Sequence, residues 1–249
     1  MILSVVIPVL NERQTLPATI AALRACRGID RIIVADGGSH DGTREWLRAQ
    51  PGIVLVNSAR GKGPQVNAGA AAATGSLASA NVAASASGSV GSPEGIVLFL
   101  HADCLISQPA LNELRAALAD ERVAGGAFLI RFSEDRPRSL RLVAWGINLR
   151  ARLRSSATGD QGIFVRKSVF TAIGGAPDWP LFEDVELVRR IKKAGSFIVL
   201  KSPLTISARR YIRHGVLKTA LLIYLLRLAY WLGISPLRLK KWFSDTRET

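Results

Sequence analysis

The sequence predicts an α/β fold in which helices flank a mostly parallel central sheet. Short apolar runs, each about the length of a buried strand, alternate with helix-like segments through the first half of the chain. This alternation is typical of βαβ units, whose strands lie parallel. The clearest run is Ile96–Asp103, where β-branched and aromatic residues end at a carboxylate. Because such sheets bind ligands beyond the carboxyl ends of their strands, we expect Asp103 to face the functional site.

The first half of the chain alternates strands and helices in a regular order. The predicted strands are short aliphatic runs, and the predicted helices begin after polar residues or glycine turns. In chain order, the expected elements are strand Leu3–Ile7 ended by Pro8, a helix ending near Cys26, strand Ile32–Ala35, helix Thr43–Gln50 capped by Asp41, strand Ile53–Val56, a basic glycine loop over residues 60–64, and helix Gln65–Ala73.

Residues 74–94 interrupt this pattern. The segment consists largely of Gly, Ser, Ala and Asn and contains almost no large apolar side chain. It cannot bury enough surface to offset the entropy lost on folding, so we expect a flexible insert.

The second half returns to alternating elements after the strand that begins at Ile96. Its helices have clear apolar faces, and one has acids in its first turn and bases in its last. The expected elements are helix Pro109–Glu121, strand Gly126–Phe132, basic helix Ser139–Ser155, strand Gly162–Val165, helical turn Lys167–Ile173, helix Glu183–Ala194, strands Phe197–Leu200 and Thr205–Ala208, and helix Gly215–Gly233.

The last of these helices is strongly apolar. As a helix, Val216–Ile234 would be roughly 30 Å long, which is enough to cross a bilayer core. Lys218 and Arg227 argue against crossing, because their spacing places them on opposite helix faces. Basic flanks with Trp231 and Trp242 favour contact with an anionic membrane surface. Packing against the rest of the chain or against a dimer partner is the alternative.

The charge of the chain narrows its partners. The 249 residues carry 33 Lys and Arg against 19 Asp and Glu, a formal net charge of +14. This excess suits a polyanionic partner: nucleic acid, nucleotide phosphates or an anionic membrane. Two cysteines cannot define a disulfide framework, and the first residues are typical of a strand rather than a signal peptide. We therefore expect a cytoplasmic protein, in part peripheral to the inner face of the cell membrane.

Four motifs occur in an order that resembles family 2 glycosyltransferases. They are Ser4–Glu12, Val34–Thr43, Leu98–Asp103, and Gly174–Gly175 followed by Phe182–Asp184. The resemblance covers roughly Ile2 to Gly195. It implies a GT-A-like nucleotide-binding fold over residues 1–208 and inverting sugar transfer, with residues 209–249 forming a helical extension.

The resemblance implies that Asp36 binds the nucleotide through its base or ribose. A carboxylate after a strand can accept hydrogen bonds from ribose hydroxyls or a uracil N–H. A turn-forming aspartate is the alternative. Lys62 lies in a glycine loop that could cradle phosphate, with a solvated basic loop as the alternative. We expect the same side of the site to include Pro8, Asn11, Glu12 and Asn67.

Asp103 is the candidate metal ligand, since the resemblance implies Mn²⁺ or Mg²⁺ held against the donor diphosphate. The family motif usually carries another acid where this chain has His101. Three interpretations of His101 stay open: contact with phosphate, ligation of an ion such as Mn²⁺, or packing without a further role. Cys104 has no thiol partner at metal-ligand spacing, so we interpret it as structural.

Asp184 is the candidate general base, with Glu183 as the second choice. Inverting transfer requires the acceptor hydroxyl to lose its proton during attack, and a nearby carboxylate suffices. The alternative is that both acids only stabilise a helix N-terminus. Asp160 and Gln161 are assigned to the acceptor or donor-sugar side, with a plain turn equally open. Arg209 could close on the diphosphate or be a surface residue.

The predicted function is metal-assisted sugar transfer from a nucleotide-sugar donor, with UDP favoured, to a lipid-linked or membrane-proximal acceptor. One alternative is a sugar nucleotidyltransferase, although no glycine-rich phosphate loop follows the first strand. Another is a non-catalytic basic module that binds nucleic acid or lipid. Acids at strand ends would repel nucleic-acid phosphates, which disfavours nucleic acid as a partner. The oligomeric state stays open, and a homo-oligomer is compatible with the sequence.

Overall fold

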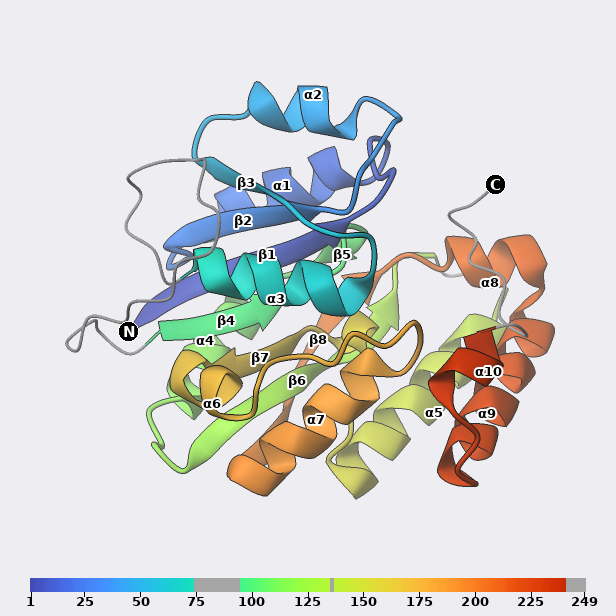
Figure 1. The fold of residues 1–249 in the computed structure, drawn as a ribbon. Helices are drawn as coiled ribbons and strands as arrows, with labels where there is room; N and C mark the ends of the chain where they lie inside the picture. The colour runs from blue at the N-terminus through green and yellow to red at the C-terminus, as the bar shows by residue number, and fades with distance from the viewer. Residues whose placement is uncertain (74–94, 135–136, 241–249) are drawn as a thin grey trace.

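A mixed sheet forms the centre of the computed structural model, which describes residues 1–73, 95–134 and 137–240 (Figure 1). The insert predicted over residues 74–94 lies outside the described residues. The strands are β1 (Ile2–Val9), β2 (Arg31–Asp36), β3 (Ile53–Asn57), β4 (Gly95–Phe99), β5 (Cys104–Leu105), β6 (Val123–Phe132), β7 (Ile163–Arg166) and β8 (Ser196–Ile206). Within the described chain they form one eight-stranded sheet in the order β3-β2-β1-β4-β7-β6-β8-β5.

Most strands of this sheet run in one direction. β1 lies parallel to β2 and β4, β2 lies parallel to β3, and β6 lies parallel to β8. β7 runs antiparallel to β4 and β6, and the short β5 runs antiparallel to β8. The mostly parallel α/β fold predicted from the alternating strands and helices is therefore confirmed. Its parallel strands bring their carboxyl ends to one edge.

Helices cover both faces of the sheet. One core cluster joins the sheet to α1 (Leu16–Ala25), α2 (Thr43–Arg48), α4 (Gln108–Ala117) and α5 (Ser139–Arg154). The cluster on the other face includes α3 (Lys62–Ala72), α6 (Lys167–Ala172) and α7 (Glu183–Ala194), which lie in front of the sheet in Figure 1.

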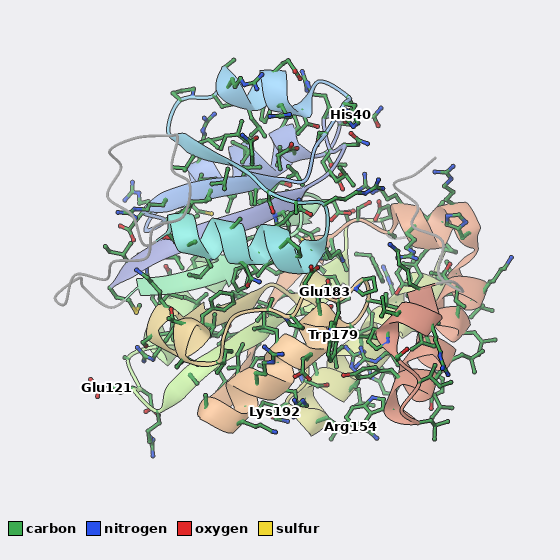
Figure 2. All side chains as sticks on the ribbon, viewed as in Figure 1. His40, Glu121, Arg154, Trp179, Glu183 and Lys192 are labelled. Atoms are coloured by element: carbon green, nitrogen blue, oxygen red, sulfur yellow. The ribbon has the colours of Figure 1, made fainter. Side chains whose placement is uncertain are left out.

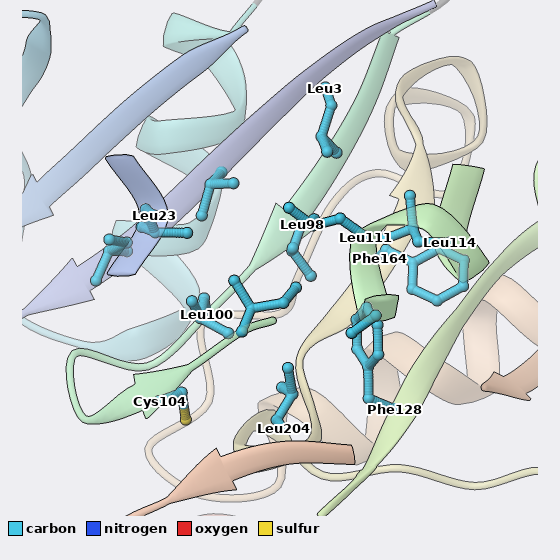
Figure 3. Close-up of a cluster of buried hydrophobic side chains, with 14 of the residues drawn as sticks. Leu3, Leu23, Leu98, Leu100, Cys104, Leu111, Leu114, Phe128, Phe164 and Leu204 are labelled. Atoms are coloured by element: carbon cyan, nitrogen blue, oxygen red, sulfur yellow. The ribbon is translucent and has the colours of Figure 1, made fainter. Parts of the chain in front are cut away.

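The two core clusters follow from side-chain alternation along the strands. In β4, Leu98 belongs to one cluster and Phe99 to the other. Figure 3 shows the first cluster, where Leu98 and the helix residue Leu111 lie near Phe164. The rings of Phe128 and Phe164 meet edge to face with centroids 5.8 Å apart. Burial of such large apolar side chains fixes the sheet under the site.

Pro8 does not end the first strand, which continues to Val9. The carbonyl of Val6 accepts a hydrogen bond from the N–H of Leu100, on the side of β1 where β4 lies. Because strand positions two residues apart point to the same side, the backbone nitrogen of Pro8 also points to the β4 side. The pairing with β4 ends at Val6 and Phe99. The missing N–H of Pro8 therefore costs no ladder hydrogen bond, because no strand lies beside it there.

Two further boundaries differ from the prediction. α3 begins at Lys62 rather than Gln65, because Pro64 is acceptable in the first helical turn. The predicted strands Phe197–Leu200 and Thr205–Ala208 are one strand, β8, with a bulge after Leu200. The carboxylate of Glu113 accepts the backbone N–H groups of Lys201 and Ser202 in this bulge, both at 2.8 Å.

Within the described part of the chain, three helices follow the sheet and lie beyond its carboxyl edge, at the right of Figure 1. They are α8 (Arg209–His214), α9 (Val216–Trp231) and α10 (Pro236–Lys240). Their inner side chains pack on the remainder of the chain, with the rings of Phe182 and Tyr230 at 4.8 Å between centroids. None of the described helices has the length and apolarity needed to cross a membrane.

Candidate functional site

An open cleft of about 2440 Å³ lies at the carboxyl edge of the sheet. The loops after β1 and β4, the first turn of α3 and the start of α7 form one side of it, and α5, α8, α9 and α10 form the other. Figure 2 shows Trp179 and Glu183 at the start of α7, toward the C-terminal helices. The position agrees with the rule that such sheets bind ligands beyond their strand ends.

The cleft brings together most of the residues predicted from the sequence. Those on its lining are Asn11, Glu12, Lys62, His101, Asp103, Asp160, Glu183, Asp184 and Arg209. The predicted residues outside the lining are Pro8, Asp36, Asn67 and Gln161.

Arg209 connects the C-terminal helices to two strand ends. Its Nη2 atom lies 2.9 Å from Oε2 of Glu12 and 3.5 Å from Oδ2 of Asp103. Glu12 is buried, and its carboxylate also accepts a hydrogen bond from the Thr15 hydroxyl at 2.6 Å. Burial alone would lower the pKa of Arg209, but the hydrogen bond and charge of Glu12, with the charge of Asp103, raise it. The cation is therefore held firmly at the strand ends.

Asp36 forms the turn that follows β2. Its buried carboxylate accepts hydrogen bonds from the backbone of Gly38 and from the backbone and hydroxyl of Ser39. Nε of Arg44 lies 3.5 Å from Oδ2. Asn11 is tied to the same turn, since its N–H donates to Oγ of Ser39 at 2.9 Å. These contacts are those of the turn-forming alternative, and nucleotide binding by Asp36 stays a prediction.

Three other predicted residues have structural contacts instead of a place in the cleft. The side-chain amide of Asn67 binds both the N–H and the carbonyl of Ala176, at 2.9 and 2.8 Å. The fully buried Gln161 accepts from Thr158 and donates to the carbonyl of Phe128. Both side-chain amides thus form hydrogen bonds with backbone groups, as side-chain amides near turns commonly do. Pro8 is buried within β1.

The residues that could hold a divalent cation follow β4. Side-chain donor atoms of His101, Asp103 and Cys104 all lie within 4.8 Å of one another. Burial, followed by the charges of Asp103 and Asp160, raises the pKa of the Cys104 thiol well above its ordinary value. The buried thiol also donates to the carbonyl oxygen of Asp160, at 3.9 Å. The remaining carboxylate and imidazole fit Mn²⁺ or Mg²⁺, with other positions left for phosphate oxygens and water.

The candidate base lies close to this pair through Gly159. The N–H of Gly159 donates to Oδ2 of Asp184 at 2.6 Å, and the N–H of Val185 donates to Oδ1 at 2.7 Å. A Cβ atom at Gly159 would lie 2.7 Å from Nε2 of His101 and 3.4 Å from Oδ2 of Asp184. Residues more than 80 positions apart in the chain are thereby brought to the two sides of one glycine. Glu183 is buried beside Asp184.

A group of hydrogen-bond donors on the helical side of the cleft is not predicted from the sequence: Arg150 of α5, Ser156 just after it, and Arg227 of α9. The one signal in the sequence is an arginine within a strongly apolar helix, which also argues against membrane crossing. The docking of α9 beside α5 assembles the group.

The comparisons with known proteins agree with the family that the sequence motifs resemble. The sequence model of glycosyl transferase family 2 matches residues 4–171. No curated protein sequence matches the chain.

Several solved structures share the fold. TarS 1-349 of S. aureus is 16% identical with a TM-score of 0.57, over 84% of this chain and 61% of that one. The Pyrobaculum calidifontis mannosyltransferase PcManGT, in complex with GDP-Man and Mn²⁺, is 21% identical with a TM-score of 0.57, over 81% and 54%. Glucosyl-3-phosphoglycerate synthase of Mycobacterium tuberculosis, in complex with Mn²⁺, UDP and phosphoglyceric acid, is 21% identical with a TM-score of 0.58, over 94% and 79%. The chain thus spans about three fifths of TarS 1-349.

Proposed function

Because the chain belongs to glycosyl transferase family 2, we propose that it transfers a sugar from a nucleotide-sugar donor to an acceptor hydroxyl, with inversion and with a divalent cation. The observation that carries the proposal is the place of His101 and Asp184 on the two sides of Gly159 in one cleft, with Asp103 beside His101. The GT-A-like α/β fold agrees with it. The family favours this function over the nucleotidyltransferase and the non-catalytic basic module.

The donor is proposed to bind between the strand ends and the first turn of α3. Lys62 opens this helix and lines the cleft with Asn11 and Glu12. Backbone N–H groups at a helix start, together with a lysine, suit phosphate oxygens. The similar structures were solved with UDP, UDP-GlcNAc or GDP-Man. A UDP-sugar is our first choice of donor.

Asp103 and His101 are proposed to hold Mn²⁺ or Mg²⁺. Bound there, the cation would stabilise negative charge on the departing nucleoside diphosphate as a Lewis acid. An imidazole ligand favours Mn²⁺ over Mg²⁺, which prefers oxygen ligands alone. The guanidinium of Arg209, at 3.5 Å from Asp103, adds a second positive charge on the same side of the cleft.

Asp184 is proposed to accept the proton of the attacking hydroxyl. Two backbone N–H groups fix its carboxylate, and each oxygen keeps a further lone pair for the acceptor. A single base opposite the leaving group suits a direct displacement, which inverts the anomeric centre. Glu183 is the second choice, because its buried position leaves less access to an acceptor.

The acceptor is proposed to be lipid-linked or close to a membrane. Among the described residues, nearly all exposed large apolar side chains lie on α5 and between Ile212 and Leu237. Several, including Leu153, Tyr224 and Trp231, also line the cleft that contains Asp184. An apolar wall with basic neighbours suits a lipid chain at an anionic surface.

The test is thermal unfolding with UDP, GDP, CDP and ADP, each with and without Mn²⁺. A ligand that binds only the folded state stabilises it by about 2.7 kcal/mol at 100 times its Kd. One diphosphate should stabilise the protein with the metal, and Asp103→Ala should abolish the effect. Glu121→Ala, far from the cleft in Figure 2, is the matched carboxylate control and should retain it. Absence of stabilisation by every nucleotide would overturn the proposed donor site.

A further inference from the structure

The helical side of the cleft contains buried donors that nothing in the described chain satisfies. Six buried side-chain polar atoms lack a hydrogen-bond partner among the described residues, and three of them belong to cleft-lining residues. These three are Nε of Arg150, Oγ of Ser156 and Nη1 of Arg227. Native proteins satisfy nearly all buried polar atoms, so unsatisfied donors on the lining of a cleft require an acceptor from outside the chain, either water or a ligand.

Arg227 is the most unusual member of the cluster. It lies on the apolar helix α9, and its buried Nη1 atom has no hydrogen-bond partner among the described residues. Burial, followed by the charge of Arg150, lowers the pKa of Arg227 to about 10. Holding a charge in this position destabilises the folded chain, which is typical of residues kept for binding.

Arg150 shares this environment. Its Nη2 atom donates to Oε1 of Gln161 at 3.0 Å, which fixes the guanidinium but leaves Nε without a partner. Burial lowers its pKa, with the charges of Asp160 and Asp184 acting in the opposite direction. Arg154 adds a third positive charge whose field reaches both guanidinium groups.

The nearby acids do not neutralise these arginines by contact. The carboxylate of Asp160 accepts the hydroxyl of Thr158, and the carboxylate of Asp184 accepts the N–H groups of Gly159 and Val185. Their charges are close enough to shift the pKa values of both arginines. The cluster therefore keeps an excess of positive charge and of N–H and O–H donors beside the candidate base.

We propose that Arg150, Ser156 and Arg227 bind a phosphate or a similar oxyanion carried by the acceptor. The proposal rests on the proposed function, since it takes Asp184 as the base. Arginine forks match the paired oxygens of phosphate, and a serine hydroxyl adds a third donor. The donor substrate is expected elsewhere, beside Glu12, Lys62 and Asp103. The oxyanion can belong to a soluble phosphorylated compound or to the headgroup of a lipid.

The test measures binding of glycerol 3-phosphate and of a monomeric short-chain phosphatidic acid to the full chain by calorimetry, with UDP and Mn²⁺ present. Arg227→Met and Arg150→Met should each weaken binding roughly 10- to 100-fold, as expected for loss of a charged hydrogen bond. Arg227→Lys should lose less. The matched controls are Arg152→Met and Lys218→Met, exposed positions on the same helices outside the cleft lining.

Stability separates binding from a structural role. Arg227→Met removes a guanidinium whose Nη1 atom is buried without a partner, so the melting temperature of the variant should equal or exceed that of the wild type. A lower melting temperature with unchanged phosphate binding would overturn the proposal, as would equal losses in the control variants.

Donor binding distinguishes this proposal from the proposed function. If Arg227→Met weakens UDP–Mn²⁺ binding as much as phosphate binding, the cluster belongs to the donor and the inference is wrong. If no nucleotide binds, the donor proposal fails, while an Arg227-dependent phosphate site still stands. Tighter binding of the phosphatidic acid would identify a lipid headgroup, and tighter binding of glycerol 3-phosphate a soluble acceptor. If neither probe binds, no oxyanion site exists.

Discussion

Arg209 lies between Glu12 and Asp103, with its Nη2 atom 2.9 Å from one carboxylate and 3.5 Å from the other. The first residue of α8 thus joins the end of the first motif to the candidate metal ligand. This contact fixes the C-terminal helices over the strand ends, where they complete the cleft.

Replacing Arg209 with methionine should destabilise the fold. Glu12 would stay buried without its cation, while its bond to Thr15 would remain. Because Arg209 is about half exposed, we expect a loss of about 1–2 kcal/mol rather than the larger cost of breaking a fully buried pair. Urea unfolding measures this loss. A double-mutant cycle with Glu12→Gln should give a coupling near 1 kcal/mol, and additive effects would contradict the ion pair.

Replacing Asp184 with asparagine should reduce kcat by roughly 10²- to 10⁴-fold, the usual contribution of a general base. The affinity for UDP and Mn²⁺ should stay unchanged, since Asp184 is proposed to act on the acceptor and not to bind the donor or the metal. Glu183→Gln is the matched comparison and should cost far less. If Glu183→Gln shows the greater loss of kcat, the base is Glu183. A loss of nucleotide affinity in Asp184→Asn would instead indicate a role toward the donor.

Cys104 should not contribute to metal binding. Its side chain is buried at the wall of the cleft, whereas Asp103 and His101 are partly exposed there. Cys104→Ala should therefore keep the affinity for Mn²⁺, measured by electron paramagnetic resonance, and His101→Ala should weaken it. A thiol reagent should modify Cys26 in the folded protein and Cys104 only after unfolding. Loss of Mn²⁺ binding in Cys104→Ala would place sulfur among the ligands.

Glu186 should make the stability depend on pH. Its buried carboxylate accepts from Nε of Arg189 at 2.6 Å and from Nε of Arg190 at 3.0 Å. The Arg189 hydrogen bond is the largest cause that lowers the pKa of Glu186 below its ordinary value of 4.5. Because the pKa is lowered in the folded state, the ion pair contributes its full stability to the fold above the ordinary pKa of 4.5. This contribution is lost as the pH falls through the pKa of the folded state.

Glu186→Gln should accordingly lose about 1–2 kcal/mol near neutral pH, and the difference from the wild type should shrink below pH 4.5. Glu45→Gln is the control, because Glu45 is exposed and its oxygen lies 3.9 Å from Arg48. It should change the stability by less than about 0.5 kcal/mol. If Glu186→Gln loses the same unfolding free energy at about pH 3 and about pH 7, on the two sides of the ordinary pKa, the stability does not depend on the titration of Glu186.

The strands of the sheet were predictable because each one depends on a local pattern in the sequence. β1, β2 and β4 are nearly continuous apolar runs, and in an α/β protein such a short run is typical of a strand that is buried on both faces. The wrong boundaries depend on distant contacts. Pro8 is tolerated because β4 ends before it, and the bulge in β8 is satisfied by Glu113 from another helix. Neither condition can be found in the local sequence.

The site was predictable in part from strand ends and in part from the resemblance to a known family. Asp103 is expected because it ends a strand, His101 and Asp184 follow from the resemblance, and all three line the cleft. Asp36 also ends a strand, but it lies outside the lining. The prediction was weaker for amides, because Asn67 and Gln161 can equally bind a ligand or a backbone turn, and here they bind the backbone. The donor cluster on α5 and α9 arises from helix docking, which no spacing in the sequence specifies.

The exposed apolar side chains of α5 and α9 lead to the last prediction. These helices pack against each other, and Trp145, Leu153 and Trp231 are each more than half exposed. Apolar rings among basic side chains suit an anionic bilayer surface, where contact would bring the cleft to a lipid-linked acceptor. The protein should sediment with vesicles that contain phosphatidylglycerol and much less with pure phosphatidylcholine. Added salt should weaken this binding, since screening reduces attraction between surface charges.

Trp145→Gln combined with Leu153→Gln should reduce vesicle binding without lowering the melting temperature, because both side chains are exposed already. Leu105→Gln, an exposed apolar residue of β5, is the control and should bind vesicles as the wild type does. If the wild type does not bind anionic vesicles, or if the double variant and the control lose binding equally, α5 and α9 do not face a membrane. The acceptor would then be a soluble molecule that enters the cleft from solution.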